Sequence, residues 1–310
     1  MCSGRVPHKL LHSLSPELKI FHGDGLCEHD LDFYYPSFSN LTELAFQYME
    51  SQSIGDLVRH TPWLKKLVLG YNNPPVGESS GVVHCSDISM LYVALEAVQP
   101  STAWEHILLP SLTKLELGTV NIPKLLVDSE GYDYFADIQA FSNVLLRSNC
   151  ALQTVKLVHM KGEDAISIIA LHPSIVDLSL AVYYHEYAEL KKIFVEMMFQ
   201  KECTSILVPN LCSLSILVDL DCCNFDSDPD FDRLICHDIA ELVDSRNRIS
   251  VCESRGIAQL EQFALDSRVH ASTLGESVRS HLPTIEILEK DIKEFCIEVS
   301  FVLFLHFDVY

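Results

Sequence analysis

The sequence predicts an α/β fold in which short parallel strands alternate with helices along an irregular solenoid. In such a fold a curved sheet lies inside and the helices lie outside. Three observations predict it: a short apolar pattern recurs, amphipathic helical patterns separate its copies, and turn-forming loops account for the longer gaps. Because a solenoid grows by stacking similar units, a length of 310 residues does not decide between one domain and two.

The recurring pattern is an apolar residue, two variable residues, an apolar residue, one variable residue and a last apolar residue. Its last four residues alternate between apolar and variable positions, as in a strand with one buried face. Because so short a strand is not stable alone, we expect the copies to stack as a parallel sheet. Copies begin at Leu41, Leu64, Leu112, Leu152, Ile175, Leu211 and Leu260, and a weaker copy covers residues 17–21.

Helical patterns occupy the intervals between these copies. Parallel strands need crossover connections, which are usually helical. Asp87 is a suitable N-terminal cap for one of the predicted helices. The predicted helices are residues 53–64, 87–98, 134–148, 164–175, 186–200 and 230–246.

The copies are unevenly spaced, by 23, 48, 40, 23, 36 and 49 residues. Leucine-rich repeats are usually about 20–29 residues long, and only two of the intervals lie in that range. We therefore expect an irregular leucine-rich-repeat-like solenoid with insertions. Residues 71–81 and 219–232 are rich in turn-forming residues and are predicted to be loops.

The solenoid is predicted to cover residues 14–295. Residues 1–13 form an N-terminal lead without the long apolar run of a signal peptide. Residues 296–310 form an apolar C-terminal tail that lies outside the pattern. No apolar run of about 18 residues occurs, so no membrane-spanning helix is expected.

Acidic residues outnumber basic ones by 43 to 22, for a net charge of −21. A chain this acidic repels phosphate backbones and anionic lipids, so neither nucleic acid nor a membrane is an expected partner. The eleven cysteines are scattered, and no secretion signal accompanies them. They are typical of reduced thiols in a cytoplasmic or nuclear protein.

Five segments resemble the leucine-rich-repeat region of fungal F-box-like proteins, especially those of mushroom-forming fungi (basidiomycetes). They are residues 109–118, 141–157, 171–180, 207–216 and 242–248, the last followed by the copy at Leu260. The resemblance covers about residues 14–292. It implies protein recognition and, in the family, substrate selection for an SCF-type ubiquitin ligase.

The F-box, the helical module that grips a Skp-type adaptor, is missing from the resemblance. Residues 14–21 are similar to its start, but Gly23, Gly25 and the strand pattern from Leu41 leave no room for the remainder. The two glycines are predicted to form a turn. A Skp-type adaptor is therefore an expected partner only if an F-box exists upstream.

No catalytic, cofactor-binding or metal site is expected. Ser79 lies in a GESSG sequence that matches the nucleophile elbow of serine hydrolases, but no strand precedes it and no helix follows, which favours a flexible loop. Acidic residues alternate like calcium ligands without the Gly and Glu of an EF-hand loop, at Asp226, Asp228, Asp230 and Asp232. The cysteines between residues 212 and 252 lack the paired spacing of a zinc site.

The remaining candidate site is the solvent-facing side of the predicted sheet, at the third and fifth positions of each copy. Lys66, Lys114 and Lys156 form a basic stripe there, which we expect to contact an acidic segment of a partner. Ordinary solvated strand residues are the alternative. The predicted partner-binding residues are Lys66, Lys114, Glu116, Lys156 and Asp177. The full set of outward positions is Glu43 and Ala45, Lys66 and Val68, Lys114 and Glu116, Thr154 and Lys156, Asp177 and Ser179, Ser213 and Ser215, and Gln262 and Ala264.

The predicted function is recognition of an unidentified protein or peptide rather than catalysis. Three alternatives remain: a stand-alone interaction scaffold unrelated to ubiquitin, a non-functional truncated paralogue and, less favoured, a serine hydrolase.

Overall fold

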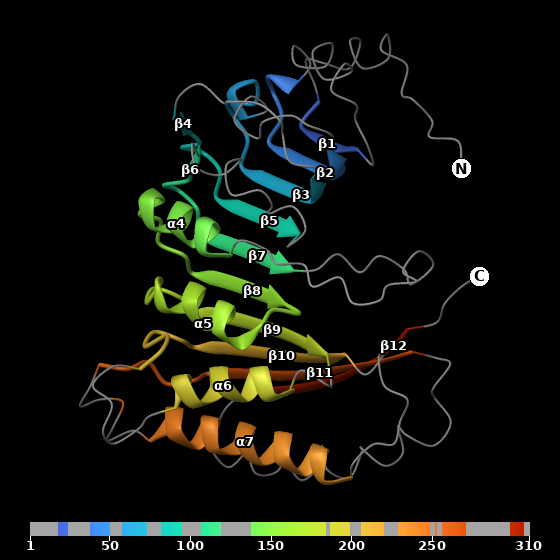
Figure 1. Ribbon diagram of the computed structural model, residues 1–310, viewed down its shortest axis with the longest axis vertical. Coiled ribbons are helices and arrows are strands. Elements are labelled where there is room, and N and C mark those ends of the chain that lie inside the picture. The colour runs from blue at the N-terminus through green and yellow to red at the C-terminus, as the bar shows by residue number, and fades with distance from the viewer. Residues whose placement is uncertain are drawn as a thin grey trace. The chain divides into compact units, whose positions relative to one another are not determined.

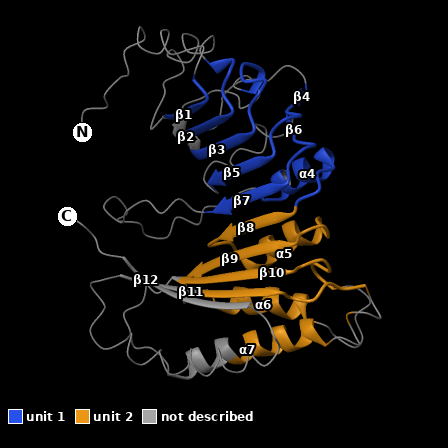
Figure 2. Cartoon of the chain, turned by 180° about the vertical axis from the view of Figure 1, so that it is seen from behind, with its two compact units in different colours: residues 1–152 blue, residues 153–310 orange. Residues whose placement is uncertain are grey.

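The computed structural model divides the chain into two compact units, unit 1 (Met1–Leu152) and unit 2 (Gln153–Tyr310). Each unit contains helix and parallel sheet, which confirms the predicted α/β class (Figures 1 and 2). The structure describes residues 18–23, 38–49, 58–72, 82–94, 107–118, 138–183, 187–198, 206–219, 229–248, 252, 256–270 and 298–306.

The main sheet of unit 1 is parallel, and its strands follow one another in chain order. They are β1 (Ile20–Gly23), β2 (Glu43–Met49), β3 (Lys66–Asn72), β5 (Met90–Ala94) and β7 (Lys114–Gly118). A second, two-stranded parallel sheet pairs β4 (Val83–His84) with β6 (Ile107–Leu108). Helix α4 (Ile138–Ser148) contacts β6.

Unit 2 has a parallel sheet covered by helices. Its strands, also in chain order, are β8 (Thr154–Val158), β9 (Asp177–Tyr183), β10 (Ser213–Asp219), β11 (Gln262–His270) and β12 (Glu298–His306). The helices are α5 (Gly162–Ala170), α6 (Tyr187–Met197) and α7 (Pro229–Asn247), with α6 in contact with both others. Figure 1 shows α5 and α6 in front of the strands and Figure 2, from behind, shows the strands in front of them, so these helices share one face.

Strands β2, β3, β7, β9 and β10 begin after the same type of turn. The amide of the first apolar residue donates to the carbonyl three residues earlier, for example from Leu112 to Leu109 at 3.1 Å. Proline follows the accepting residue in several of these turns, because its fixed φ suits the second position of a type I turn. The prolines are Pro62, Pro110, Pro173 and Pro209.

The strand starts are then tied to one another by a recurring pair of hydrogen bonds. The carbonyl of Lys65 accepts from the amides of Ser89 and Met90, at 3.0 and 3.1 Å. The carbonyl of Val176 accepts in the same way from Cys212 and Ser213, at 2.9 and 3.0 Å. Neighbouring segments therefore align at the same pattern position.

All the copies predicted from the sequence lie in strands. Their central apolar residues are at most 1% exposed, and they are Leu44, Leu67, Leu115, Val155, Leu178, Leu214 and Phe263. The weaker copy at residues 17–21 leads into β1. The predicted helices at residues 134–148, 164–175, 186–200 and 230–246 correspond to α4, α5, α6 and α7, although α5 ends at Ala170, before the turn at His172 and Pro173.

The helix predicted over residues 87–98 is wrong, because Met90–Ala94 is strand β5. Ile88, Leu91 and Val93 repeat the apolar pattern, and all three are buried. Ile88 lies 24 residues after Leu64 and 24 before Leu112, so the 48-residue interval contains a copy that the sequence reading missed. The apolar run around Leu91 also fits a helical period, and only its pairing with β3 and β7 decides the matter.

Three smaller predictions also need correction. In the segment predicted as helix 53–64, only Val58 and Arg59 are helical among the described residues, and a turn follows at Thr61. Gly23, expected in a turn, ends β1. The loop predicted over residues 219–232 begins in β10 and ends in the first turn of α7, since Pro229 starts that helix.

The C-terminal segment set apart as off-pattern continues the sheet. Strand β12 pairs in parallel with β11 from Gln262 opposite Glu298 to His270 opposite His306. In the sequence, Cys296 precedes Glu298 by two residues, as Leu260 precedes Gln262, so a cysteine stands at the first apolar position and hides the pattern. Residues 1–13, 73–81 and 220–228 lie outside the described residues.

In the part of the chain that the structure describes, no helix has the length and apolar character needed to cross a membrane.

Candidate functional site

The third and fifth positions of the strands form two rows in each unit. The predicted exposure is confirmed, since these side chains are half-buried or exposed, while the residues between them are buried except for the half-buried Phe21. In unit 1 the third-position row is Ile20, Glu43, Lys66, Met90 and Lys114, and the fifth-position row is His22, Ala45, Val68, Tyr92 and Glu116. In unit 2 the rows are Thr154, Asp177, Ser213 and Gln262, then Lys156, Ser179, Ser215 and Ala264.

An ionic chain links the first three strands of unit 1. Glu43 Oε1 accepts a hydrogen bond from Lys66 Nζ at 2.8 Å and contacts His22 Nε2 at 3.0 Å. The hydrogen bond from Lys66, and then that from His22, lowers the pKa of the Glu43 carboxyl. Lys66 therefore shares its charge with Glu43 but keeps 38% of its side chain exposed.

Lys66 and Lys114 lie in one row, with Met90 between them. Met90 is the direct register partner of both lysines, on β3 and β7. Tyr92 stands two residues further along β5, opposite Val68 and Glu116. The sequence reading missed Met90 and Tyr92 because it assigned β5 to a helix, whereas the apolar spacing of Ile88, Leu91 and Val93 could have found them.

The three lysines of the predicted stripe are placed within their own units. Lys66 and Lys114 share the third-position row of unit 1, and Lys156 occupies the fifth position of β8 in unit 2, opposite Ser179. Asp177 occupies a third position, opposite Thr154 and Ser213. Glu116 lies opposite Tyr92 at the fifth position of β7.

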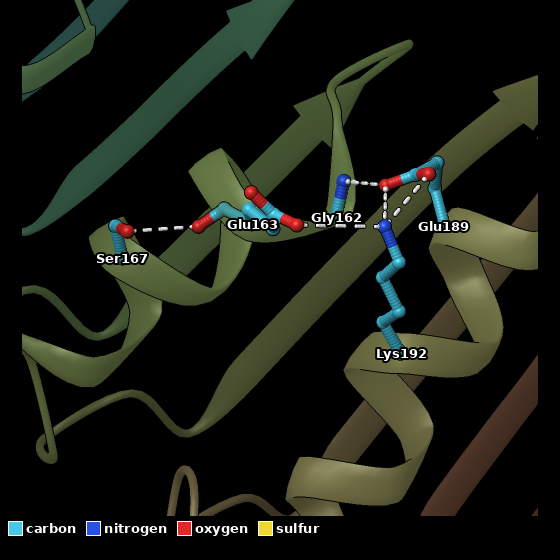
Figure 3. Close-up of polar contacts among 5 residues, drawn as sticks. All are labelled: Gly162, Glu163, Ser167, Glu189 and Lys192. Carbon is cyan, nitrogen blue, oxygen red and sulfur yellow. Dashed lines mark hydrogen bonds and ion pairs between the residues drawn. The ribbon is translucent and has the colours of Figure 1, made fainter.

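A polar cluster joins α5 to α6 in unit 2 (Figure 3). The Gly162 amide donates to Glu189 Oε2 at 2.8 Å, and Lys192 Nζ contacts Glu189 Oε1 at 3.0 Å and Glu163 Oε1 at 3.7 Å. The Gly162 amide, and then Lys192, lowers the pKa of Glu189. The carboxylate thus satisfies a free amide at the start of α5, where Lys161 provides no side-chain cap.

A second cluster joins α6 to α7. Asp238 is 4% exposed. It accepts a hydrogen bond from the Tyr187 hydroxyl, and its Oδ2 forms an ion pair with Lys191 Nζ at 2.9 Å. Tyr187 and Lys191 lie one turn apart on α6, so one carboxylate on α7 binds both. The arrangement connects two helices, as expected of a structural polar contact.

Arg246, near the end of α7, is 1% exposed and holds the turns before β10 and β11. Its Nη2 donates to the carbonyls of Val208, Leu211 and Ala258, at 3.1, 3.3 and 3.4 Å. Burial lowers the pKa of this guanidinium to about 10. Arg246 thus donates hydrogen bonds to three turn carbonyls that take no part in the pairing between strands.

The described residues contain no group of three or more His, Cys, Asp and Glu side chains placed to hold a metal ion. Cys85, Cys150, Cys212 and Cys252 are free thiols, and burial raises the pKa of each, that of Cys85 to about 12. Protonated thiols are poor nucleophiles.

The other residues weighed for catalysis or metal binding are placed only in part. Asp230 and Asp232 fall in the first turns of α7. Ser79, Asp226 and Asp228 lie outside the described residues.

No family model matches the chain, and no curated protein matches it significantly.

Proposed function

We propose that this chain recognises another protein or peptide through the exposed rows of its parallel sheets, as an irregular leucine-rich-repeat-like solenoid with a curved sheet inside and helices outside. The observation that carries the proposal is the exposure of the third and fifth strand positions beside buried apolar neighbours. Parallel sheets are normally covered on both faces. A parallel sheet that keeps one face half-exposed, with polar and apolar side chains mixed on it, is typical of solenoids, whose inner surface receives a partner.

By resemblance to fungal F-box-like proteins, the recognised partner would be a substrate of an SCF-type ubiquitin ligase. A Skp-type adaptor would join the complex only through an F-box upstream of the repeats. A stand-alone scaffold unrelated to ubiquitin would use the same surface. Affinity purification of the protein expressed from its own gene with a C-terminal tag separates the two: co-purification of a Skp-type adaptor favours the ligase role, and its absence favours the scaffold.

Site-specific photo-crosslinking tests recognition itself. Benzoylphenylalanine replaces Tyr92 in unit 1 or Ser215 in unit 2, and a control replaces Leu146, which is 51% exposed on α4. We expect one protein to crosslink from a sheet position and not from the helix position. Equal crosslinking from all three positions, or none from the sheet positions, would contradict the proposal.

A further inference from the structure

Three adjacent strands of unit 1 form a small mixed patch, which we define as Lys66, Met90, Tyr92 and Lys114. Met90 lies between the two lysines in the third-position row. Neighbouring strands are about 4.8 Å apart, so the backbone positions of Lys66 and Lys114 are separated by roughly 10 Å. Two cationic side chains therefore flank one apolar side chain.

The charge of this row differs from that of the whole chain. The chain has a net charge of −21, whereas the third-position row of unit 1 contains two lysines and one glutamate. Glu43 pairs with Lys66 through Oε1 at 2.8 Å. An ammonium has three donors, so Lys66 is able to bind a second carboxylate. The positive excess is confined to the third-position row, since Glu116 in the neighbouring row balances it, so the row attracts the carboxylates of an acidic segment and sets its register.

The apolar members of the patch are suited to contact with a partner. Met90 and Tyr92 are half-buried on the exposed side of β5, while Leu91 between them is fully buried. Methionine adapts to the shape of a neighbouring side chain, and tyrosine offers a rigid apolar ring with a polar end. Both residue types are enriched in protein interfaces.

Glu116 limits where an acidic ligand group can lie. It stands in the fifth-position row, opposite Tyr92 and two residues after Lys114 on the same strand. A ligand carboxylate over that row would be repelled, whereas over the third-position row it meets the lysines. The ligand's acidic residues are thus directed to the third-position row and its apolar residue to Met90 and Tyr92.

We propose that this patch binds an extended partner segment in which an aromatic or aliphatic side chain lies between two acidic ones. Alternate side chains of an extended segment point to the same side, so two acidic residues four apart, with the apolar residue midway, face the patch together and span about 13 Å. The long lysine side chains bridge the difference from the roughly 10 Å between their backbone positions. The proposal rests on the recognition function and names its ligand class. Lys114 contributes more than Lys66, because Glu43 shares the charge of Lys66.

Fluorescence anisotropy with four labelled peptides of equal length tests the ligand class. The first carries two glutamates four residues apart, with a phenylalanine midway between them and a serine on each side of the phenylalanine, so that all three side chains share one face of the extended peptide. The second replaces the glutamates with lysines, the third replaces them with glutamines, and the fourth replaces the phenylalanine with serine. We expect the full chain to bind the first peptide most tightly, and added salt to weaken that binding.

Three variants locate the binding on the patch. Lys114→Gln should lower the affinity for the first peptide by about two- to fivefold, which corresponds to the loss of one exposed ion pair. Lys66→Gln should weaken it less. Lys65→Gln is the matched control, since Lys65 is the exposed neighbour of Lys66 but lies outside the two rows, and it should leave the affinity unchanged.

Several outcomes would overturn the inference: equal binding of the lysine or glutamine peptide, an equal effect of Lys65→Gln and Lys114→Gln, or no binding of any peptide. Recognition itself would stand if the crosslinks still formed at the sheet positions. Loss of those crosslinks as well would remove the proposed function.

Discussion

The backbone carbonyl of Glu189 lies 2.6 Å from the position that a Cβ atom would occupy on Gly162. The start of α6 therefore approaches the start of α5 as closely as a glycine permits. The same approach brings the Glu189 side chain to the Gly162 amide. Glu189 of α6 can therefore cap α5 only because residue 162 is a glycine, which has no side chain to block the approach.

Gly162→Ala should destabilise unit 2, because the added methyl group forces the backbone of α6 away from α5. We expect a loss of about 1–3 kcal/mol, the range of overpacking. Urea unfolding followed by circular dichroism measures it. Ser167→Ala, at an exposed position of the same helix, is the control and should have little effect. An equal loss in both variants would show that the close approach is unimportant.

Glu189 should make stability depend on pH in the acidic range. The Gly162 amide and Lys192 lower the pKa of Glu189 in the folded chain below the ordinary value of 4.5. A carboxyl with a depressed folded pKa stabilises fully above its unfolded pKa, and that stability disappears as the pH falls through the folded pKa.

Glu189→Gln keeps an acceptor for the Gly162 amide but cannot titrate, so its stability should change less than that of the wild type between pH 6 and about pH 3. Glu189→Ala removes the cap as well, at a further cost of about 1 kcal/mol. Urea midpoints across this pH range measure both effects. A Gln variant that loses stability with acid as steeply as the wild type would contradict the assignment.

Arg246→Ala should cost about 3 kcal/mol or more, because the carbonyls of Val208, Leu211 and Ala258 each lose a hydrogen bond and a cavity remains. Arg246→Lys keeps a cation but lacks the planar guanidinium, so part of the loss should remain. Amide hydrogen exchange in the turns around Val208 and Ala258 should accelerate in both variants. Arg248→Ala, an exposed change two residues away, is the control. Unchanged exchange in these turns would contradict the role of Arg246.

The assignment of β5 predicts opposite tolerances at two adjacent residues. Leu91 is 0% exposed, so Leu91→Ala should cost about 2–5 kcal/mol, while Met90→Ala at a half-exposed position should cost less than about 1 kcal/mol. Thermal unfolding of the two variants measures the difference. Similar losses of stability in the two variants would contradict the alternation of buried and exposed residues along β5.

Much of this fold could be predicted, because apolar and polar residues alternate in the sequence of a strand that has one buried face. The spacing of Leu64, Leu67 and Leu69 predicts β3 without reference to any other segment. The exposed rows follow from the same period, so the sequence predicts Lys66 and Lys114 as candidate site residues. It does not predict Met90 and Tyr92, since the apolar run around them fits both helix and strand.

By itself the sequence determined which side chains are buried, because the burial period of a strand or helix is local. The tertiary structure alone decided which distant groups meet: that Glu189 caps a helix 27 residues before it, and that Arg246 binds the carbonyls of Val208 and Ala258. These relationships depend on pairing and close approach between distant segments, and no local pattern encodes them.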